Sequence, residues 1–188
     1  MSNQHMMPPP IAKAIHFGPF LVFHTTPFSF ALVNLKPLLP GHVLICPHRS
    51  TPRLSQLTAA EIADLFQTVQ LVSRTLTRVY GASALNIAVQ DGADAGQSVA
   101  HVHAHIIPRR AGDEGGGDRV YDMIEGEQGD VGRAQRELEE YRARARPRFP
   151  KLDEGSRRAR SESEMRKEAE WLKGEMEKDA RERRGGNV

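Results

Sequence analysis

The sequence predicts an α+β fold, in which a mainly antiparallel sheet carries helices on one side. Several short segments rich in β-branched and aromatic residues occur in succession, both before and after one long helical segment. A second helical segment follows near the C-terminal end. Strands and helices do not alternate one by one, as they would in a parallel βαβ repeat. A chain of 188 residues has room for one domain of ordinary size and an appendage.

The strand segments fill most of the first 110 residues. Residues 1–13, which precede them, are polar and proline-rich and are expected to form a flexible end. Strands are expected at FLVFH, FSFALVNL, GHVLICP, ALNIAVQ and HVHAHIIP, which are bounded by Pro, Gly or Asp. Residues 111–120 are too rich in glycine and charge to pack, which predicts a flexible loop.

A long helix is predicted between the third and fourth strand segments. Thr58 and Glu61 have the spacing of a capping box, and Gly81 is a typical residue after a helix end. Between them, apolar residues recur at helical spacing, at Ile62, Leu65, Phe66, Val69, Val72, Leu76 and Val79. This pattern predicts a helix that packs on the core as part of the scaffold.

A second helix is predicted over residues 161–184. The string SESE offers a capping box at Ser161, and an apolar stripe follows at Met165, Ala169, Leu172 and Met176. The charged segment before it, residues 126–160, is expected to be disordered, and its sequence indicates no function.

Composition limits where the protein works. Cys46 is the only cysteine, which excludes an internal disulfide and fits a reducing compartment. The N-terminal MSNQHMMPPP lacks the basic and apolar regions of a secretory signal. No apolar run approaches the roughly 20 residues needed to cross a bilayer. We therefore expect a soluble protein with no membrane partner. Its expected compartment is the cytoplasm, and the nucleus is a further candidate.

The charge distribution argues against a nucleic-acid partner. The formal net charge is +2, and residues 131–188 carry 17 Lys and Arg against 13 Asp and Glu. Charges in that part alternate in sign, which is more typical of a solvated helical face than of a nucleic-acid footprint.

Three histidines alternate in HVHAHIIP, which occupies residues 101–108. On a strand, His101, His103 and His105 would share one face. The outer two would lie about 13 Å apart at Cα, so a single strand could hardly deliver all three to one zinc ion. A second interpretation, that the three histidines have only a structural role, remains open. Phosphoryl chemistry is the third interpretation, because a neutral imidazole nitrogen can attack phosphorus while its neighbours stabilise charge.

The wider pattern resembles a known family. HVHAHII fits the motif His-x-His-x-His followed by apolar residues. Together with FSFALVNLKPLLPGHVLICP, LTAAEIADLFQTVQ and QDGADAGQSVAHVHAHIIPR, it is similar to the fragile histidine triad branch of the histidine triad superfamily, the dinucleoside triphosphate hydrolases. The resemblance covers residues 14–125 and implies a histidine-triad catalytic domain there.

The resemblance implies roles for four histidines. His103 corresponds to the nucleophile that attacks the α-phosphorus, and His105 to the residue that contacts the scissile phosphate. His101 and His42 correspond to supporting histidines that fix the orientation of the imidazoles. Both could equally be structural histidines.

The resemblance also implies a set of substrate-binding residues. Asn34 corresponds to a residue at the ribose, and Gln90 to a glutamine at the phosphates. A loop over the phosphates would be formed by Gly96, Gln97, Ser98 and Val99. Ser98 stands where threonine is common in the family, and Ala104 where valine is usual.

The implied reaction is hydrolysis of diadenosine triphosphate to AMP and ADP through a covalent nucleotidyl-histidine. Mg²⁺ or Mn²⁺ would arrive with the substrate phosphates, because no carboxylate cluster is visible and Asp91 and Asp94 have turn contexts. No organic cofactor is implied. The resemblance also implies a homodimer that shares a continuous sheet. Tyr121 aligns with a tyrosine of the family, and its regulatory phosphorylation is a hypothesis. A nucleoside phosphoramidase and a nucleotide-bound signalling module with slow turnover remain alternatives.

Overall fold

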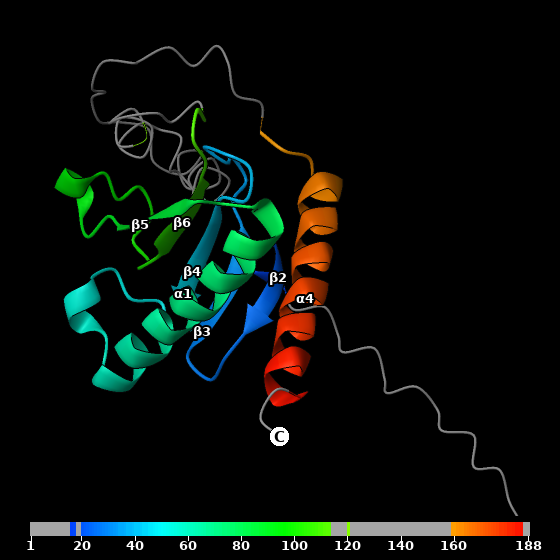
Figure 1. Cartoon of the computed structure of the whole chain (residues 1–188). Helices are drawn as coiled ribbons and strands as arrows, with labels where there is room; N and C mark the ends of the chain where they lie inside the picture. Colours follow the sequence, from blue (N-terminus) through cyan, green and yellow to red (C-terminus); the bar gives the residue numbers. More distant parts are fainter. Residues whose placement is uncertain (1–15, 18–19, 114–119, 121–158, 186–188) are drawn as a thin grey trace, which may run out of the picture.

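The computed structural model describes residues 16–17, 20–113, 120 and 159–185 (Figure 1). The predictions for residues 1–13, for most of 111–120, for residues 126–158 and for Tyr121 therefore lie outside the described residues. The described elements follow the predicted order, with strands on both sides of one long helix and a second helix at the end.

In the described part of the chain, six strands form one sheet in the order β1-β2-β3-β4-β6-β5. All neighbouring strands are antiparallel. The strands are β1 (His16–Phe17), β2 (Phe20–Thr25), β3 (Ser29–Val33), β4 (Val43–Pro47), β5 (Ala84–Val89) and β6 (Ala104–Arg109). This arrangement confirms the α+β class and the five predicted strands. Strand β1 was not predicted, because two residues are too short to show an alternating pattern.

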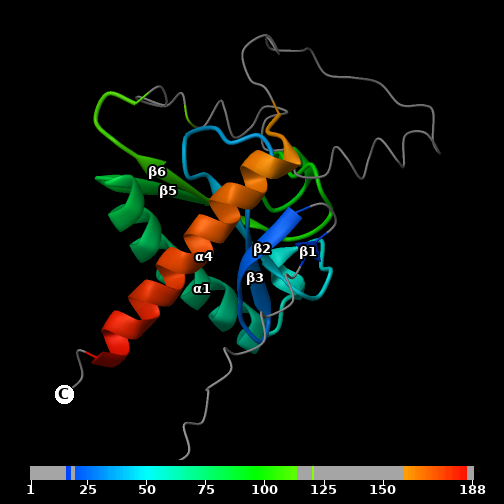
Figure 2. The same ribbon diagram turned by 90° about the vertical axis from the view of Figure 1, so that its right-hand side faces the viewer.

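Two long helices lie side by side on the same face of the sheet (Figures 1 and 2). Helix α1 (Ala59–Tyr80) packs on β3, β4, β5 and β6, and helix α4 (Glu162–Gly185) packs on β2, on β3 and on α1. Between these helices and the sheet lies the main core, which includes Val43, Ile45, Leu65 and Leu172. The predicted placement of helices on one side is therefore confirmed.

Helix α1 begins and ends as its sequence predicts. The Thr58 side chain accepts from the Glu61 N–H, the Glu61 carboxylate accepts from the Thr58 N–H, and Gly81 closes the helix in the left-handed conformation. One predicted core position is wrong, because the Phe66 side chain is 42% exposed. Thr68 and Thr75 are buried instead. Phe66 is offset by one residue, about 100° around the helix, from the buried Leu65.

Helix α4 confirms the predicted stripe of Met165, Ala169, Leu172 and Met176, all of which are buried. Ser161 forms the predicted capping box, since its Oγ accepts from the Glu164 N–H and the Glu164 carboxylate accepts from the Ser161 N–H. At the other end, Arg78 of α1 forms ion pairs with Glu175 and Asp179 at 2.6 and 2.7 Å.

The strand that carries the histidines is shorter than predicted. Strand β6 begins at Ala104, so His101 and His103 precede it and only His105 lies within it. The prediction that all three histidines share one face of a strand is therefore wrong. The physical reason is a long-range main-chain hydrogen bond, because the Val102 N–H donates to the Thr51 carbonyl at 2.7 Å and not to a neighbouring strand.

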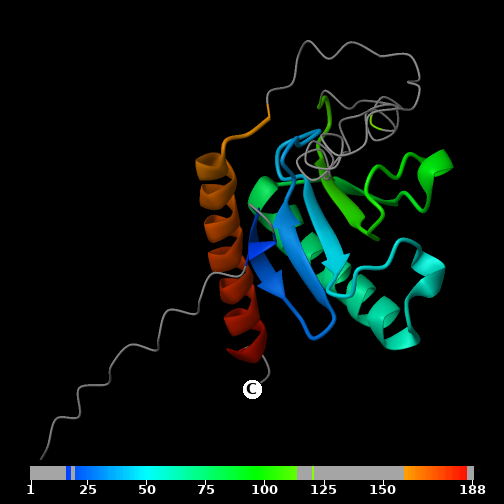
Figure 3. The same cartoon turned by 180° about the vertical axis from the view of Figure 1, so that it is seen from behind.

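The face of the sheet opposite the helices is seen from behind in Figure 3. His105 is paired with Leu44 of β4 across the ladder, and both are fully buried. A second small apolar cluster contains Leu38, Leu39, Ile107 and Val120. No described helix is both long enough and apolar enough to cross a membrane.

Candidate active site

A tight turn places His42 at the start of β4. Gly41 adopts φ +81°, a backbone conformation that residues other than glycine rarely adopt. A Cβ at this position would lie 2.7 Å from the ring of Tyr80 and 2.9 Å from Pro108. The glycine therefore allows the turn to pack closely on α1 and β6. His42, the next residue, is fully buried.

A chain of hydrogen bonds fixes the proton positions on His42 and His105. The Leu38 N–H donates to His42 Nδ1 at 3.2 Å, so this nitrogen is an acceptor and the proton of neutral His42 lies on Nε2. His42 Nε2 lies 2.9 Å from His105 Nδ1 and donates to it. The proton of His105 must then lie on its Nε2. That N–H is buried and has no partner among the described residues.

His103 has the opposite arrangement. Its Nδ1 lies 2.8 Å from the His101 carbonyl oxygen, which can only accept, so Nδ1 carries the proton. The other ring nitrogen, Nε2, therefore carries a lone pair. It is buried and has no hydrogen-bond partner among the described residues. The rings of His103 and His105 lie close together, with centroids 4.9 Å apart.

His101 is held by the end of β4. Its Nε2 lies 2.8 Å from the Pro47 carbonyl oxygen and donates to it. Its own carbonyl accepts from His103 Nδ1. His101 therefore links β4 to His103, which fits the supporting position that the resemblance implies.

Burial keeps the four histidines uncharged. The pKa of His105 is lowered to about 3, first by burial and then by the neighbouring His103. Burial is also the largest cause that lowers the pKa values of His42, His101 and His103. Since all four shift in this direction, the rings are neutral at pH 7.

The predicted phosphate loop connects β5 to the start of β6. Val89 of β5 pairs with Ala104 of β6. Gln90, which follows Val89, and His103, which precedes Ala104, therefore occupy the next pair of positions on the two antiparallel segments. The Gly92 carbonyl accepts from the N–H groups of Ala95 and Gln97. Gly96 lies in the left-handed region at φ +82°, where glycine is favoured. The loop therefore begins and ends beside His103.

Gln97 is turned into its own loop. Its Oε1 accepts from the Gly92 N–H at 2.8 Å, and its Nε2 donates to the Pro52 carbonyl at 2.9 Å. In this conformation the side chain supports the loop. Val99 contributes its carbonyl, which accepts from the His101 N–H at 2.7 Å. Contacts of Gln97, Ser98 and Gln90 with phosphates stay predictions.

Asn34 lies beside His42 at the end of β3. Its amide nitrogen is 3.3 Å from His42 Nε2 and 3.4 Å from Nδ1, so the amide lies against the imidazole ring. Its Oδ1 accepts from the Lys36 N–H. The side chain is buried, and its predicted contact with a ribose stays a prediction.

Metal ligation has no support from the described side chains. Among the described residues, no group of three or more His, Cys, Asp or Glu side chains could hold a metal ion. Asp91 accepts from the Leu54 N–H at 2.8 Å, as its turn context predicts. The only cysteine in the sequence, Cys46, is buried, and burial raises its thiol pKa to about 12.

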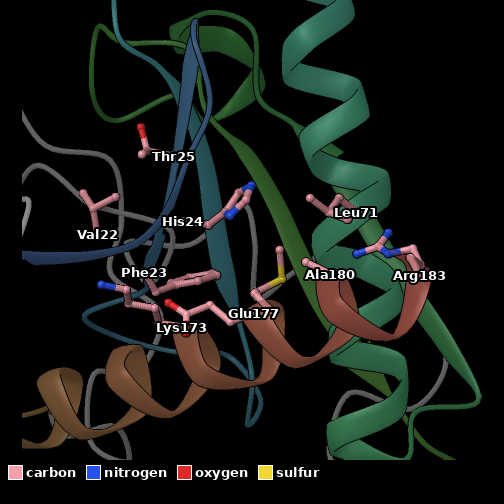
Figure 4. Close-up of a pocket in the computed structure, with 10 residues that line it drawn as sticks. Val22, Phe23, His24, Thr25, Leu71, Lys173, Glu177, Ala180 and Arg183 are labelled. Carbon is pink, nitrogen blue, oxygen red and sulfur yellow. The ribbon is translucent and has the colours of Figure 1, made fainter. Parts of the chain in front are cut away.

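A cavity of about 340 Å³ lies between β2, α1 and α4 and is not lined by any of the four histidines of the candidate site (Figure 4). It is lined by side chains such as Phe23, His24, Leu71 and Met176. None of the predicted site residues lines it. The candidate active site is therefore identified by side-chain chemistry and not by this cavity.

Sequence reasoning missed the main-chain groups that orient the histidines. These are the Leu38 N–H and the carbonyls of Pro47 and His101. Any residue other than proline supplies such an N–H, and every residue supplies the carbonyl, so no residue type signals these roles. The site that results can combine a nucleophilic nitrogen with a neighbouring hydrogen-bond donor in a buried, uncharged environment.

Comparisons with known proteins show the family of the chain. The family model described as HIT domain matches residues 19–112. A bis(5'-nucleosyl)-tetraphosphatase [asymmetrical] of Schizosaccharomyces pombe is 45% identical over 175 residues, which cover 86% of this chain and 94% of that protein. A bis(5'-adenosyl)-triphosphatase of Dictyostelium discoideum is 45% identical over 139 residues, which cover 71% and 92%.

A solved structure supports the fold over most of the chain. The diadenosine triphosphate hydrolase of Plasmodium falciparum, in complex with Cyclomarin A, aligns with a TM-score of 0.60 and 26% identity. The alignment covers 89% of this chain and 87% of that one.

Proposed function

This chain belongs to the HIT domain family, and on that premise we propose that it hydrolyses dinucleoside polyphosphates through a covalent nucleotidyl group on His103. One observation carries the proposal. His103 Nε2 is unprotonated and buried and has no partner among the described residues, and the ring lies next to that of His105, with centroids 4.9 Å apart.

In the first step, the lone pair of His103 Nε2 bonds to the α-phosphorus of diadenosine triphosphate. The bond between this phosphorus and the bridging oxygen breaks, and ADP leaves with that electron pair. The imidazole ring becomes positively charged, so its Nδ1–H interacts more strongly with the His101 carbonyl. This hydrogen bond therefore stabilises the transition state more than the ground state.

His105 acts on the phosphate in the same step. Its Nε2–H donates to a phosphate oxygen near the reacting bond and stabilises the charge that spreads over the phosphoryl group. His42 holds this donor in place, because it donates to His105 Nδ1 and so fixes the tautomer.

In the second step, water completes the reaction. The water oxygen bonds to phosphorus, the N–P bond breaks, and its electron pair returns to His103 Nε2. The proton lost by the water passes to solvent, and AMP leaves. The same donors serve both steps, because both transition states carry charge on the same phosphate oxygens.

The substrate class follows from the named activities of the relatives. The two curated relatives differ in their names, one a tetraphosphatase and the other a triphosphatase. We propose diadenosine triphosphate as the main substrate and diadenosine tetraphosphate as the second candidate. A divalent cation, Mg²⁺ or Mn²⁺, would reach the site bound to the substrate phosphates and would neutralise part of their charge.

We also propose that two copies of the chain form a dimer with a continuous sheet. Strand β5 lies at one edge of the sheet, and no described strand pairs with its outer side. Its Ile87 side chain is 48% exposed. An apolar edge strand of this kind readily pairs with another chain.

The covalent mechanism is tested with diadenosine triphosphate in water enriched in oxygen-18. We expect the label in AMP and none in ADP, and an acid-labile adenylyl group on His103 in rapidly quenched samples. His103→Ala is expected to lower kcat by a factor on the order of 10⁴ or more. The same assay with diadenosine tetraphosphate compares the two substrates.

Label in ADP, or near-normal turnover by His103→Ala, would overturn the mechanism. The exposed histidine variant His48→Ala serves as the control, because His48 lies on the surface and is outside the group of buried histidines.

A further inference from the structure

Arg160 joins the start of α4 to the strand end beside the active site. It is the residue before Ser161, which caps the helix. Its Nη2 donates to the Asn34 carbonyl at 2.5 Å, and its backbone N–H donates to the Leu35 carbonyl at 3.1 Å. Its Nη1 forms an ion pair with Glu168 of α4. The side chain is only 19% exposed.

Glu168 extends this contact to the turn before His42. The Tyr80 hydroxyl donates to the Glu168 carboxylate at 2.5 Å. The ring of Tyr80 occupies the space next to Gly41 where a Cβ would clash. Arg160, Glu168 and Tyr80 therefore contact both chain segments that flank His42, the end of β3 and the glycine turn.

These two segments determine where the His42 ring lies. The Asn34 N–H donates to the His42 carbonyl at 3.1 Å, and the Asn34 amide lies against the His42 ring. His42 in turn donates to His105 at 2.9 Å. A continuous series of contacts therefore runs from Arg160 to the N–H that faces the proposed phosphate.

We propose that Arg160 is a positioning residue for the reaction, which holds the Asn34 and Leu35 carbonyls so that His42 stays oriented toward His105. This proposal rests on the proposed function, since it assigns His105 a role in catalysis. The positive charge of Arg160 acts in the same direction, because it contributes, after burial and His105, to lowering the pKa of His42. A neutral His42 keeps Nδ1 free to accept from the Leu38 N–H.

The planar guanidinium is essential to this arrangement. Two of its nitrogens point in fixed directions, one to Glu168 and one to the Asn34 carbonyl. Lysine has the charge but only a single nitrogen, so it cannot hold both partners in the same geometry. Arginine and lysine should therefore differ at this position.

The test compares Arg160→Met with Arg78→Met in the full-length chain. Arg78 is a matched control, because it also links α4 to the rest of the domain through two ion pairs, at the opposite end of the helix. We expect Arg160→Met to lower kcat for diadenosine triphosphate roughly 10- to 100-fold with KM nearly unchanged. Arg78→Met should change kcat by less than about twofold at a comparable loss of thermal stability.

A spectroscopic measurement separates positioning from simple stability. In nitrogen-15 NMR spectra of labelled histidines, His42 and His105 should each show the Nε2–H tautomer in the wild type and in Arg78→Met. In Arg160→Met these two signals should shift toward a mixture of tautomers. Arg160→Lys should give an intermediate loss of kcat. If Arg160→Met does not fold, Arg160→Lys and Glu168→Gln, which keep polar groups in place, decide by the same two measurements.

The proposal is overturned if a folded Arg160 variant has wild-type histidine spectra and the kcat of the Arg78 control. A wild-type protein that does not cleave dinucleoside polyphosphates would instead refute the proposed function. In that case the histidine spectra would still decide whether Arg160 orients His42, so the two failures are distinguishable.

Discussion

His103 and His105 are the same residue type, but hydrogen bonds to their Nδ1 atoms give their Nε2 atoms opposite properties. A carbonyl at Nδ1 leaves a lone pair on His103 Nε2, whereas the His42 N–H at Nδ1 leaves a proton on His105 Nε2. The nucleophile and the donor are therefore distinguished before any substrate binds. This difference depends on neighbours that lie 2.8 to 2.9 Å away, and not on the histidines themselves.

The stability of the protein should fall on acidification. The pKa values of four buried histidines are lowered, so the folded protein leaves these rings neutral where the unfolded chain, with pKa values near 6.5, begins to bind protons. The unfolded state then binds more protons, and stability decreases as pH falls below 6.5. Between pH 6.5 and its own lowered pKa, each buried ring contributes a slope of about 1.4 kcal/mol per pH unit. Above pH 7.5 the slope vanishes and the stabilisation is at its full value.

Urea unfolding between pH 7.5 and 4.5 measures this slope. In His105→Asn the slope should decrease by the contribution of one proton, because the pKa of His105 is lowered to about 3. The wild type, measured over the same pH range, is the reference for this decrease. A slope in His105→Asn equal to that of the wild type would contradict the assignment of a neutral, buried His105.

At the scale of elements, two glycines should respond to alanine in opposite ways. Gly41 has φ +81° and faces the Tyr80 ring at 2.7 Å, so Gly41→Ala should lower the free energy of unfolding by roughly 1 to 3 kcal/mol. Gly174 lies within α4, and no atom beyond its chain neighbours and the nearby helix backbone lies within 4 Å of the position that a Cβ would occupy. Gly174→Ala should raise the free energy of unfolding by about 0.5 to 1 kcal/mol, because alanine favours the helix.

Chemical denaturation of the two variants, followed by circular dichroism, provides the measurement. Gly174→Ala also serves as the control for Gly41→Ala, since both add a single methyl group. Equal stabilities for the two variants would show that the turn before His42 tolerates a side chain and is not the tight contact described here.

The helices could be predicted from sequence because their signals are local. Both capping boxes span only four residues, and the stripe from Met165 to Met176 repeats along a single helix. The site could be predicted only in part. The motif identified the histidines, but the start of β6 depends on a hydrogen bond from Val102 to Thr51, which are 51 positions apart. Contacts of this kind leave no pattern in neighbouring residues.

At the scale of the whole molecule, the exposed edge of the sheet makes dimer formation testable. Ile87 on β5 is 48% exposed, and burial of its remaining exposed surface where two β5 strands meet would stabilise a dimer by about 0.7 to 1.5 kcal/mol for each copy. Ile87→Lys should therefore shift the protein toward the monomer, because a charged residue opposes pairing at a strand edge.

Light scattering over a range of protein concentrations provides the measurement. Trp171→Lys is the control, since Trp171 is also an exposed apolar residue, at 43%, but lies on α4 and not on β5. The wild type and the Trp171 variant should have the mass of a dimer. A wild-type protein that stays a monomer at high concentration would reject the proposed dimer.

The contact between Arg160 and Asn34 joins residues 126 positions apart. The ribosome makes every proposed catalytic histidine before it makes Arg160. During synthesis the nascent chain can form the sheet and α1, but the support behind His42 is still missing. We therefore expect catalytic competence to arise late, after the C-terminal helix has left the ribosomal tunnel and docked.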